Sequence, residues 1–300
     1  MIVGHILGGL GNQMFQYAAA RSLATAKGKP LYLDLSDFPG YHLHYGFELS
    51  KVFCGTFEAA DEEQLGQVLG WRAHHSLRNM LKRRQMALFR SKRFVVEPHF
   101  HYWPGFFEAP DDCYLAGYWQ SERYFKPIEE IIRKEFTFKS APSGQNEELA
   151  KQIAGCNAVS LHIRRGDYVS DARTRATNGL VSLAYYQNAI SRIAEAVSTP
   201  VFFVFSDDME WVQENFNIPF QCQFILHNQG AESYKDMQLM SLCQHHIIAN
   251  SSFSWWGAWL NSKHGKIVIY PQEWFVNTRI NIEDLTPRDW IGIAGTRGIG

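Results

Sequence analysis

The sequence predicts an α/β protein with parallel sheets, and three observations predict this class. Short apolar strands alternate with helical segments through the second half of the chain. A glycine-rich turn lies between the first apolar segment and the first helix, and a polar segment divides the 300 residues into two parts. Strands that alternate with helices form parallel sheets covered on both faces, in which ligands bind beyond the carboxyl ends of the strands.

The first 35 residues form one strand–helix–strand unit, with apolar strands at 2–6 and 31–35. The turn Gly8-Gly9-Leu10-Gly11-Asn12-Gln13 lets a ligand approach the backbone and exposes N–H groups at the start of a helix. A dinucleotide-binding fingerprint needs a further glycine where Met14 stands, although Asp34 keeps a nicotinamide site open as an alternative. A simple tight turn is the other alternative.

Residues 71–93 contain eight Lys or Arg residues and no acidic residue, with leucines among them, which predicts a basic amphipathic helical region. Two interpretations stand. The basic side chains form a solvated surface, or they bind an anionic lipid surface or a lipid-linked acceptor as a peripheral membrane contact.

The segment 139–147 is polar and contains Pro and Gly, so we interpret it as a linker between an N-terminal α/β domain, 1–140, and a C-terminal domain, 148–300. The C-terminal elements follow one another regularly. The predicted strands are 158–163, 201–205, 223–226, 247–249 and 266–270, and the predicted helices begin at Ser182, Met209, Tyr234 and Ser252.

Composition excludes several classes of function. The 29 Lys and Arg residues against 30 Asp and Glu give a net charge of −1, so nucleic acid is not an expected partner. Five widely spaced cysteines without a C-x-x-C pair indicate a reducing compartment and no structural zinc. Met1 leads directly into an apolar strand without signal-peptide features, so a soluble cytoplasmic protein is predicted.

Three polar clusters directly follow predicted strands and should therefore meet at one sheet edge. They are Arg164-Arg165-Gly166-Asp167-Tyr168, Ser206-Asp207-Asp208 and Asn250-Ser251-Ser252. An arginine pair there suits a nucleotide diphosphate, because guanidinium offers fixed parallel donors and permanent charge. A structural salt bridge of the arginines with Asp167 or Asp207 is the alternative. Adjacent aspartates diverge, so Asp207-Asp208 does not predict a metal site.

The segment Asn250–Leu260 places serines at the start of a predicted helix and tryptophans 255, 256 and 259 within it. The serines can contact a phosphate, or only cap a helix whose tryptophans form core. Asp236, near the start of the preceding helix, could accept from guanine N1–H and the exocyclic amino group. Serving the helix dipole is its ordinary role.

With these residues assembled, the chain closely resembles the α-1,2-fucosyltransferases of bacteria and animals. The matching motifs begin at Gly8 (GGLGNQMFQYA), Gly117 (GYWQSE), His162 (HIRRGDY), Phe205 (FSDD) and Asn250 (NSSFSWWGAWL). The resemblance implies a GT-B fold, with two Rossmann-like domains that face each other across a cleft. It also implies inverting transfer from GDP-fucose, a co-substrate, with no cofactor and no metal.

The resemblance extends more loosely to α-1,6- and protein O-fucosyltransferases, and it implies roles for individual residues. Arg164 would hold the β-phosphate as GDP leaves, His162 and Asp236 would contact the guanosine, and Ser251 and Ser252 the phosphates. The remaining residues expected on the donor are Gly9, Gly11, Asn12, Arg165, Asp207, Asp208, Asn250 and Phe253.

The implied reaction transfers L-fucose to the 2-hydroxyl of galactose on an oligosaccharide or lipid-linked glycan, as in bacterial surface polysaccharide synthesis at the inner membrane face. Asp167 and Asp171 are the candidates for the general base, because the glutamate that follows the arginines in α-1,6 relatives has no counterpart here. The acceptor is expected on residues 35–138. A transferase for another GDP-sugar, and a non-catalytic GDP-sugar or glycan-binding module, are the alternatives.

Overall fold

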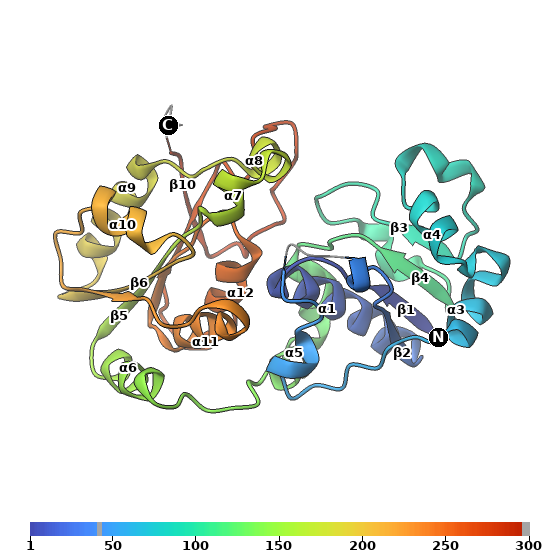
Figure 1. Ribbon diagram of the computed structural model, residues 1–300, viewed down its shortest axis with the longest axis horizontal. Coiled ribbons are helices and arrows are strands. Elements are labelled where there is room, and N and C mark those ends of the chain that lie inside the picture. The colour runs from blue at the N-terminus through green and yellow to red at the C-terminus, as the bar shows by residue number, and fades with distance from the viewer. Residues whose placement is uncertain (41–43, 296–300) are drawn as a thin grey trace. The chain divides into compact units, whose positions relative to one another are not determined.

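The computed structural model describes residues 1–40 and 44–295, with all their side chains except those of Asp167 and Arg173. The chain forms two compact units, each with its own sheet (Figure 1). Unit 1 comprises Met1–Lys139 and Asn281–Thr286, and unit 2 comprises Ser140–Ile280 and the residues from Pro287 onward. The segment 281–286, which the sequence assigned to the C-terminal domain, thus returns to the N-terminal unit.

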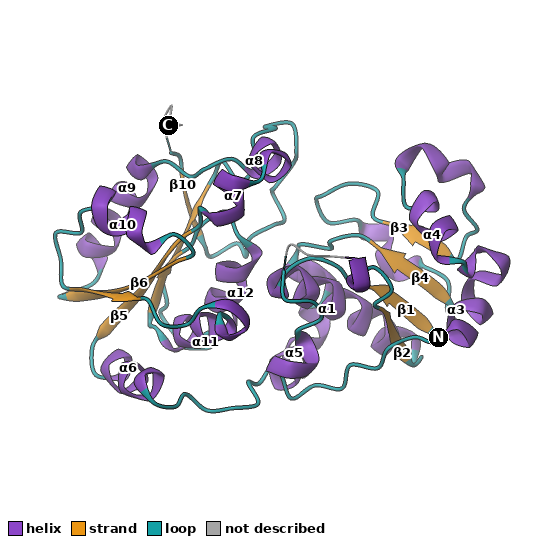
Figure 2. Cartoon of the chain, viewed as in Figure 1, coloured by secondary structure: helices purple, strands orange, loops and turns teal. Residues whose placement is uncertain are grey.

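Unit 1 is built on a four-stranded parallel sheet in the order β2-β1-β4-β3, with helices packed around it (Figure 2). Its strands are β1 Ile2–His5, β2 Leu31–Asp34, β3 Phe94–Val96 and β4 Cys113–Ala116. Its α-helices are α1 Leu10–Lys27, α2 Leu49–Val52, α3 Glu62–Leu69, α4 His75–Leu81 and α5 Glu129–Glu135. Short 3₁₀ helices are η1 Phe38–Gly40, η2 Gly70–Ala73, η3 Arg84–Phe89, η4 Pro104–Glu108, η5 Glu122–Tyr124 and η6 Lys126–Ile128.

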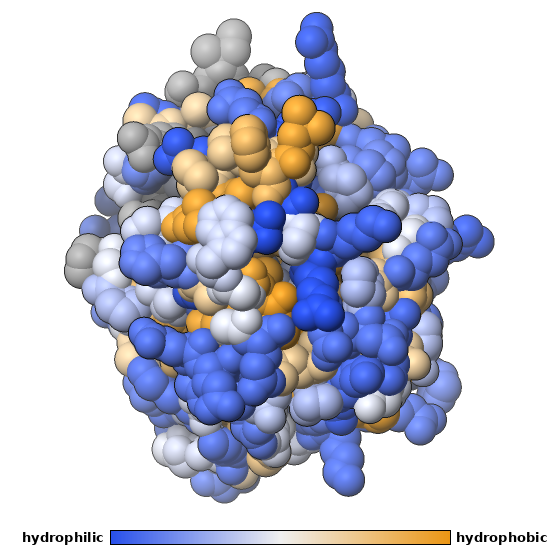
Figure 3. Space-filling model, turned by 90° about the vertical axis from the view of Figure 1, so that its right-hand side faces the viewer, coloured by the Kyte–Doolittle hydropathy of each residue, from blue (hydrophilic) through white to orange (hydrophobic). Residues whose placement is uncertain are grey.

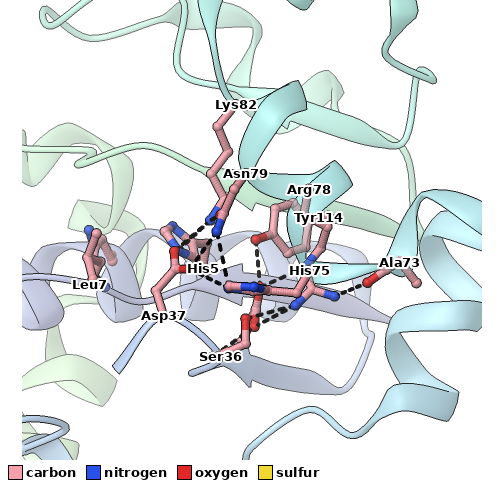
Figure 4. A network of polar contacts seen from close by, with 12 residues as sticks. His5, Leu7, Ser36, Asp37, Ala73, His75, Arg78, Asn79, Lys82 and Tyr114 are labelled. Atoms are coloured by element: carbon pink, nitrogen blue, oxygen red, sulfur yellow. Dashed lines mark hydrogen bonds and ion pairs between the residues drawn. The ribbon is translucent and has the colours of Figure 1, made fainter. Parts of the chain in front are cut away.

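Helix α4 is anchored to this sheet by two cations of the basic region. Arg78 is only 3% exposed and pairs with Asp34 at the end of β2 (Nε–Oδ2, 3.2 Å). Lys82 contacts Asp37 (Nζ–Oδ2, 2.9 Å), and hydrogen bonding to His5 is the largest cause that lowers the pKa of Asp37. Figure 4 shows this network, which also includes Ser36, His75, Asn79 and Tyr114. The basic region is therefore helical only in short pieces, and part of its charge faces inward.

Unit 2 contains a six-stranded parallel sheet in the order β10-β9-β8-β5-β6-β7. Its strands are β5 Asn157–Ile163, β6 Pro200–Ser206, β7 Cys222–Ile225, β8 His245–Ile247, β9 Val268–Pro271 and β10 Ile291–Ile293. Its helices are α6 Gln145–Ala154, α7 Gly166–Ser170, α8 Ala172–Asn178, α9 Leu183–Ala196, α10 Met209–Asn215, α11 Tyr234–Leu242 and α12 Ser252–Leu260, with the 3₁₀ helix η7 Gly230–Glu232.

The central strands of unit 2 are covered on both faces, as their continuous apolar sequence predicts. Successive side chains of a strand point to opposite faces. Val159 and Leu161 of β5 accordingly pack in a core cluster with α9 and α10, whereas Ala158 packs in a second cluster with α6 and α11. The sheet therefore separates two cores, and both hold the carboxyl ends of β5 and β6 in place.

Two predicted boundaries differ from the structure. The strand predicted at 247–249 is observed at His245–Ile247, because His246 is buried with its ring nitrogens bonded to Ser160 and Asn261 and so behaves as a core residue. The predicted linker, 139–147, runs into α6, which begins at Gln145. None of the helices in the described ranges has both the length and the apolar character needed to span a bilayer.

Candidate functional site

The three polar clusters of unit 2 come together at one edge of its sheet. Strand β5 pairs in parallel with β6 on one side and with β8 on the other. The strand order reverses between β5 and β8, which is the point where doubly wound sheets bind ligands. Arg164 follows β5, Asp207 follows β6, and Asn250 lies just beyond β8.

Both arginines form ion pairs with the aspartates that follow β6. The Nη1 of Arg164 lies 2.9 Å from Oδ2 of Asp207, and the Nε of Arg165 lies 3.0 Å from Oδ2 of Asp208. The Arg165 guanidinium also lies 3.5 Å from the centre of the Trp211 ring, which stabilises it by cation–π attraction. Arg164 keeps 23% of its side chain exposed and Arg165 only 16%, so Arg164 is the more accessible cation.

The close approach of these two loops requires a glycine at position 166. A Cβ at this position would lie 2.3 Å from Oδ2 of Asp207, which is far inside contact distance. Asp207 also accepts a hydrogen bond from the backbone N–H of Arg165 (2.8 Å). The predicted salt bridge with Asp207 is therefore present, and it orients Arg164 at the sheet edge.

His162, on β5, carries a buried polar atom without a partner. The residue is 5% exposed, and its Nδ1 makes no hydrogen bond to the described residues. Burial lowers the pKa of His162 to about 4, so the ring is neutral at pH 7. Its ring lies 5.9 Å from that of Phe253, centre to centre, on α12. An orphan ring nitrogen beside the arginines is the kind of group that a ligand satisfies.

Asn250 and Ser251 serve the local structure. The Asn250 amide is 2% exposed and donates to three backbone carbonyls, and Ser251 caps α12 by accepting from the N–H of Phe253. The carbonyls belong to Asn178, Gly179 and Trp274. Ser252 is the first residue of α12. Tryptophans 255, 256 and 259 are buried, so their side chains form part of the core, as one of the two interpretations of the sequence expected.

Asp236 lies in the first turn of α11. Burial raises the pKa of its carboxyl group to about 7. A hydrogen bond from the Asn228 side-chain amide (2.8 Å) lowers this pKa, but its effect is smaller than that of burial. The two oxygens of a carboxyl group can accept several hydrogen bonds, so Asp236 can accept further N–H groups beside that of Asn228.

In unit 1, the glycine turn is capped by Glu48, a residue that the sequence analysis did not identify. Gly9 is the N-cap of α1 and offers no side chain, and the backbone N–H of Leu10 donates instead to the Glu48 carboxylate. Glu48 is 6% exposed, and burial raises its pKa to about 7. No local sequence pattern links Glu48 to this turn, because the contact spans dozens of residues.

The other two residues expected in this turn lie within α1. Gly11 is buried there, and Asn12 accepts a hydrogen bond from the Gln120 side chain (Oδ1–Nε2, 2.9 Å). Gln120 follows β4, which pairs with β1, so the turns after these neighbouring strands are joined at the carboxyl edge of the unit 1 sheet.

The two candidate bases differ in what the structure describes. Asp171 caps α8 by accepting from the backbone N–H of Thr174 (2.7 Å). Asp167 lies on α7, and its side chain is outside the described residues. Among the described side chains, no group of three His, Cys, Asp or Glu residues is arranged to hold a metal ion.

Comparison with known proteins decides the family. Residues 73–294 match the model of the family described as "Glycosyl transferase family 11". The chain belongs to glycosyltransferase family 11. This family 11 member is 38% identical to an Escherichia coli protein named "Alpha-1,2-colitosyltransferase", with 98% of this chain and 99% of the relative aligned.

One further relative and one solved structure bear on the family and on the fold, respectively. A second Escherichia coli protein, "O-antigen biosynthesis glycosyltransferase WbnK", is 32% identical over 95% of this chain and 98% of its own. The solved structure of NodZ α-1,6-fucosyltransferase soaked with GDP-fucose has a TM-score of 0.50 at 17% identity, covering 86% of this chain and 91% of that one. The family 11 member therefore has the GT-B fold, which confirms the predicted fold class.

The buried Asp236 should make the stability of this family 11 member fall with rising pH. Its folded pKa of about 7 lies above the ordinary 3.8, so the folded state binds more protons between these values, and the stability it contributes at low pH is lost as pH rises toward 7. We expect Asp236→Asn to flatten this decline in urea midpoints measured from pH 4.5 to 7.5, and exposed Glu214→Gln to leave it unchanged. An unaltered slope in Asp236→Asn would contradict the assignment.

Proposed function

We propose that this family 11 member transfers L-fucose from GDP-β-L-fucose, with inversion, to the 2-hydroxyl of a galactose residue on a glycan acceptor. Five sequence motifs of α-1,2-fucosyltransferases support the donor and the linkage. The names of the two Escherichia coli relatives, one an α-1,2 transferase and one an O-antigen enzyme, support a role in bacterial surface polysaccharide synthesis.

The observation that carries the proposal is the position of Arg164. Its guanidinium lies at the carboxyl end of β5, where the strand order of the sheet reverses, and its pair with Asp207 directs it there. A guanidinium group is always charged and presents its donors in a rigid planar fork, the geometry that matches a phosphate. The first turn of α12, with Ser252, follows the neighbouring strand β8 and offers a helix N-terminus to a phosphate.

In the proposed reaction the galactose hydroxyl gives up its proton to a general base as its oxygen bonds to fucose C1. The bond from C1 to the β-phosphate oxygen breaks, and its electron pair leaves with GDP. Negative charge grows on the diphosphate in the transition state. Arg164, preorganised by Asp207, would stabilise that charge, and the buried His162 and Asp236 would hold the guanosine. Because arginines would carry this charge, we propose that no metal ion or other cofactor is required.

Arg164→Ala should lower kcat about 10²–10³-fold, which is the usual loss when one preorganised donor to a developing anion is removed. GDP release and fucosyl-lactose formation would be measured with Mg²⁺ and with EDTA, and the wild-type rate should be equal in both. Exposed Arg192→Ala, whose partner is Glu195, is the control. More than half the wild-type rate in Arg164→Ala would overturn the role, and fewer than one turnover in the wild type would favour a binding module.

The 38% identity to an α-1,2-colitosyltransferase makes GDP-colitose a second candidate donor. Colitose is L-fucose without its 3-hydroxyl group. A site built to bond a hydroxyl rejects the deoxy sugar strongly, whereas an apolar site discriminates weakly. We expect at least tenfold higher kcat/KM with GDP-fucose than with GDP-colitose on the same acceptor. The opposite ratio would assign the family 11 member to colitosyl transfer.

We also propose that unit 1 contacts an anionic membrane through the η2–η3 surface, defined as the exposed side chains Trp71, Met80, Leu88 and Phe89 with Arg83, Arg84 and Lys92. Leu88 is 95% exposed, Trp71 71% and Phe89 63%. Arg72 lies over the Trp71 ring and donates to the Phe89 carbonyl, which draws the two aromatic residues together. Figure 3 looks onto the side of the molecule where α3 and α4 lie, and apolar side chains gather there beside hydrophilic ones.

Lipid binding should require both halves of the η2–η3 surface, because apolar side chains insert while cations neutralise the head groups. The wild type should co-sediment with phosphatidylglycerol-containing vesicles at 0.1 M salt and much less at 0.5 M salt. Leu88→Ser with Phe89→Ser should weaken binding at least fivefold. The matched control is Leu180→Ser with Val276→Ser, which removes two exposed apolar side chains from unit 2. Equal binding by both variants would exclude this surface.

A further inference from the structure

The turn that follows β4, Gly117–Ser121, is held in a strained conformation. Trp119 has φ 55°, in the left-handed region, which a bulky residue adopts only when its surroundings impose it. Its indole is 1% exposed and packs against the rings of Phe106 and Tyr124. Backbone strain that is imposed by packing is typical of functional sites, so the strain at Trp119 indicates that this turn has a function.

A carboxylate fixes the turn from the neighbouring strand. Glu97 directly follows β3, and its two oxygens accept from the backbone N–H groups of Tyr118 (2.7 Å) and Trp119 (3.0 Å). A Cβ on Gly117 would lie 2.4 Å from the Glu97 Cβ, so only glycine admits this carboxylate. Glu97 makes no ion pair with a described residue, and the titratable side chains it acts on are the phenols of Tyr118 and Tyr124.

Burial therefore leaves Glu97 poised between its protonation states. Desolvation is the largest cause, and it raises the pKa of Glu97 to about 7 although the two backbone N–H groups lower it. General bases work best when their pKa is close to the working pH.

The turn also lies where a ligand is expected. Strands β1 and β4 are adjacent and parallel in the order β2-β1-β4-β3, so the turns that follow them lie at the carboxyl edge of the sheet, where α/β sheets bind ligands. Gln120 joins this turn to Asn12, which follows β1. Tyr118 is 47% exposed beside the Glu97 carboxylate. A half-exposed aromatic residue near a hydrogen-bond acceptor suits a pyranose, which has an apolar face and hydroxyl donors.

We propose that the acceptor sugar packs against Tyr118 and that Glu97 takes the proton from its attacking hydroxyl. The inference deepens the proposed function and rests on it. As the acceptor oxygen bonds to the donor sugar's C1, its O–H bond breaks and the proton passes to a Glu97 oxygen. The bond from C1 to the β-phosphate breaks, and its electron pair leaves with GDP. Asp171 is occupied as a helix cap and is not needed for this step.

Glu97→Gln tests the base. Wild-type kcat/KM for lactose should rise with pH to a plateau, with a midpoint near 7, because only the ionised carboxylate accepts the proton. Glu97→Gln should lose at least 10²-fold in kcat/KM and lack that rise, while its affinity for GDP stays within twofold of wild type. Glu97→Asp, which keeps a carboxylate, should recover part of the rate together with the pH dependence.

A purely structural Glu97 predicts a different pattern. Glu97→Gln would then lower the unfolding temperature and the rate, but the rate would keep the wild-type pH profile. Either this result or a rate above one third of the wild-type rate would overturn the role of Glu97 as general base. Should Glu97→Gln not fold, absence of the pH-dependent rise in folded Glu97→Asp overturns it equally.

Tyr118 gives an independent test of the acceptor subsite. Tyr118→Ala should raise KM for lactose at least fivefold with little change in kcat, Tyr118→Phe should resemble wild type, and Tyr45→Ala, which changes another exposed aromatic residue, should have no effect. An unchanged KM in Tyr118→Ala would exclude the subsite. All these ratios are measured relative to the wild-type rate. If the wild type transfers no fucose, the proposed function is wrong. If the wild type is active and the Glu97 variants do not behave as expected, only the role of Glu97 is wrong.

Discussion

The parallel pairing of β5 with both β6 and β8 is the constraint on which the site in unit 2 depends. Parallel strands bring their carboxyl ends to the same edge, so residues more than 80 positions apart, such as Arg164 and Asn250, follow adjacent strands. Two core clusters, one on each face, hold these strands in register. The ion pair of Arg164 with Asp207 then needs only short loops, and Gly166 lets those loops approach.

Four wholly or partly buried carboxylates of the described residues fall into two groups with different consequences. Asp37 has a lysine and histidines as partners, and its pKa is lowered, so it remains charged and anchors α4. Glu48, Glu97 and Asp236 accept mainly from backbone or amide N–H groups, and burial raises the pKa of each to about 7. The first arrangement stabilises structure. The second keeps a carboxylate responsive near neutral pH, which suits ligand binding and proton transfer.

Much of the fold could be predicted from the sequence because its elements have strong local patterns. The first helix, α1, lies between its two predicted strands, and β5 and β6 lie within a residue of their predicted bounds, because apolar periodicity defines these elements. Strands β3 and β4 were not predicted, because each has only three or four residues in an aromatic-rich segment. Strand β8 was predicted two residues too late, because the pair His245-His246 is polar in the sequence. In the structure His246 lies in the core, where Ser160 and Asn261 form hydrogen bonds with its ring nitrogens.

The sequence by itself determined the family, the alternation of strands and helices, and which polar clusters follow which strands, because motifs and periodicity are local properties. Only the tertiary structure decided the partners of those clusters: Asp207 for Arg164, Glu48 for the N-terminus of α1, and Glu97 for the turn after β4. Those contacts join residues far apart in the chain. Their geometry and their pKa values arise from burial and close approach, which no local pattern records.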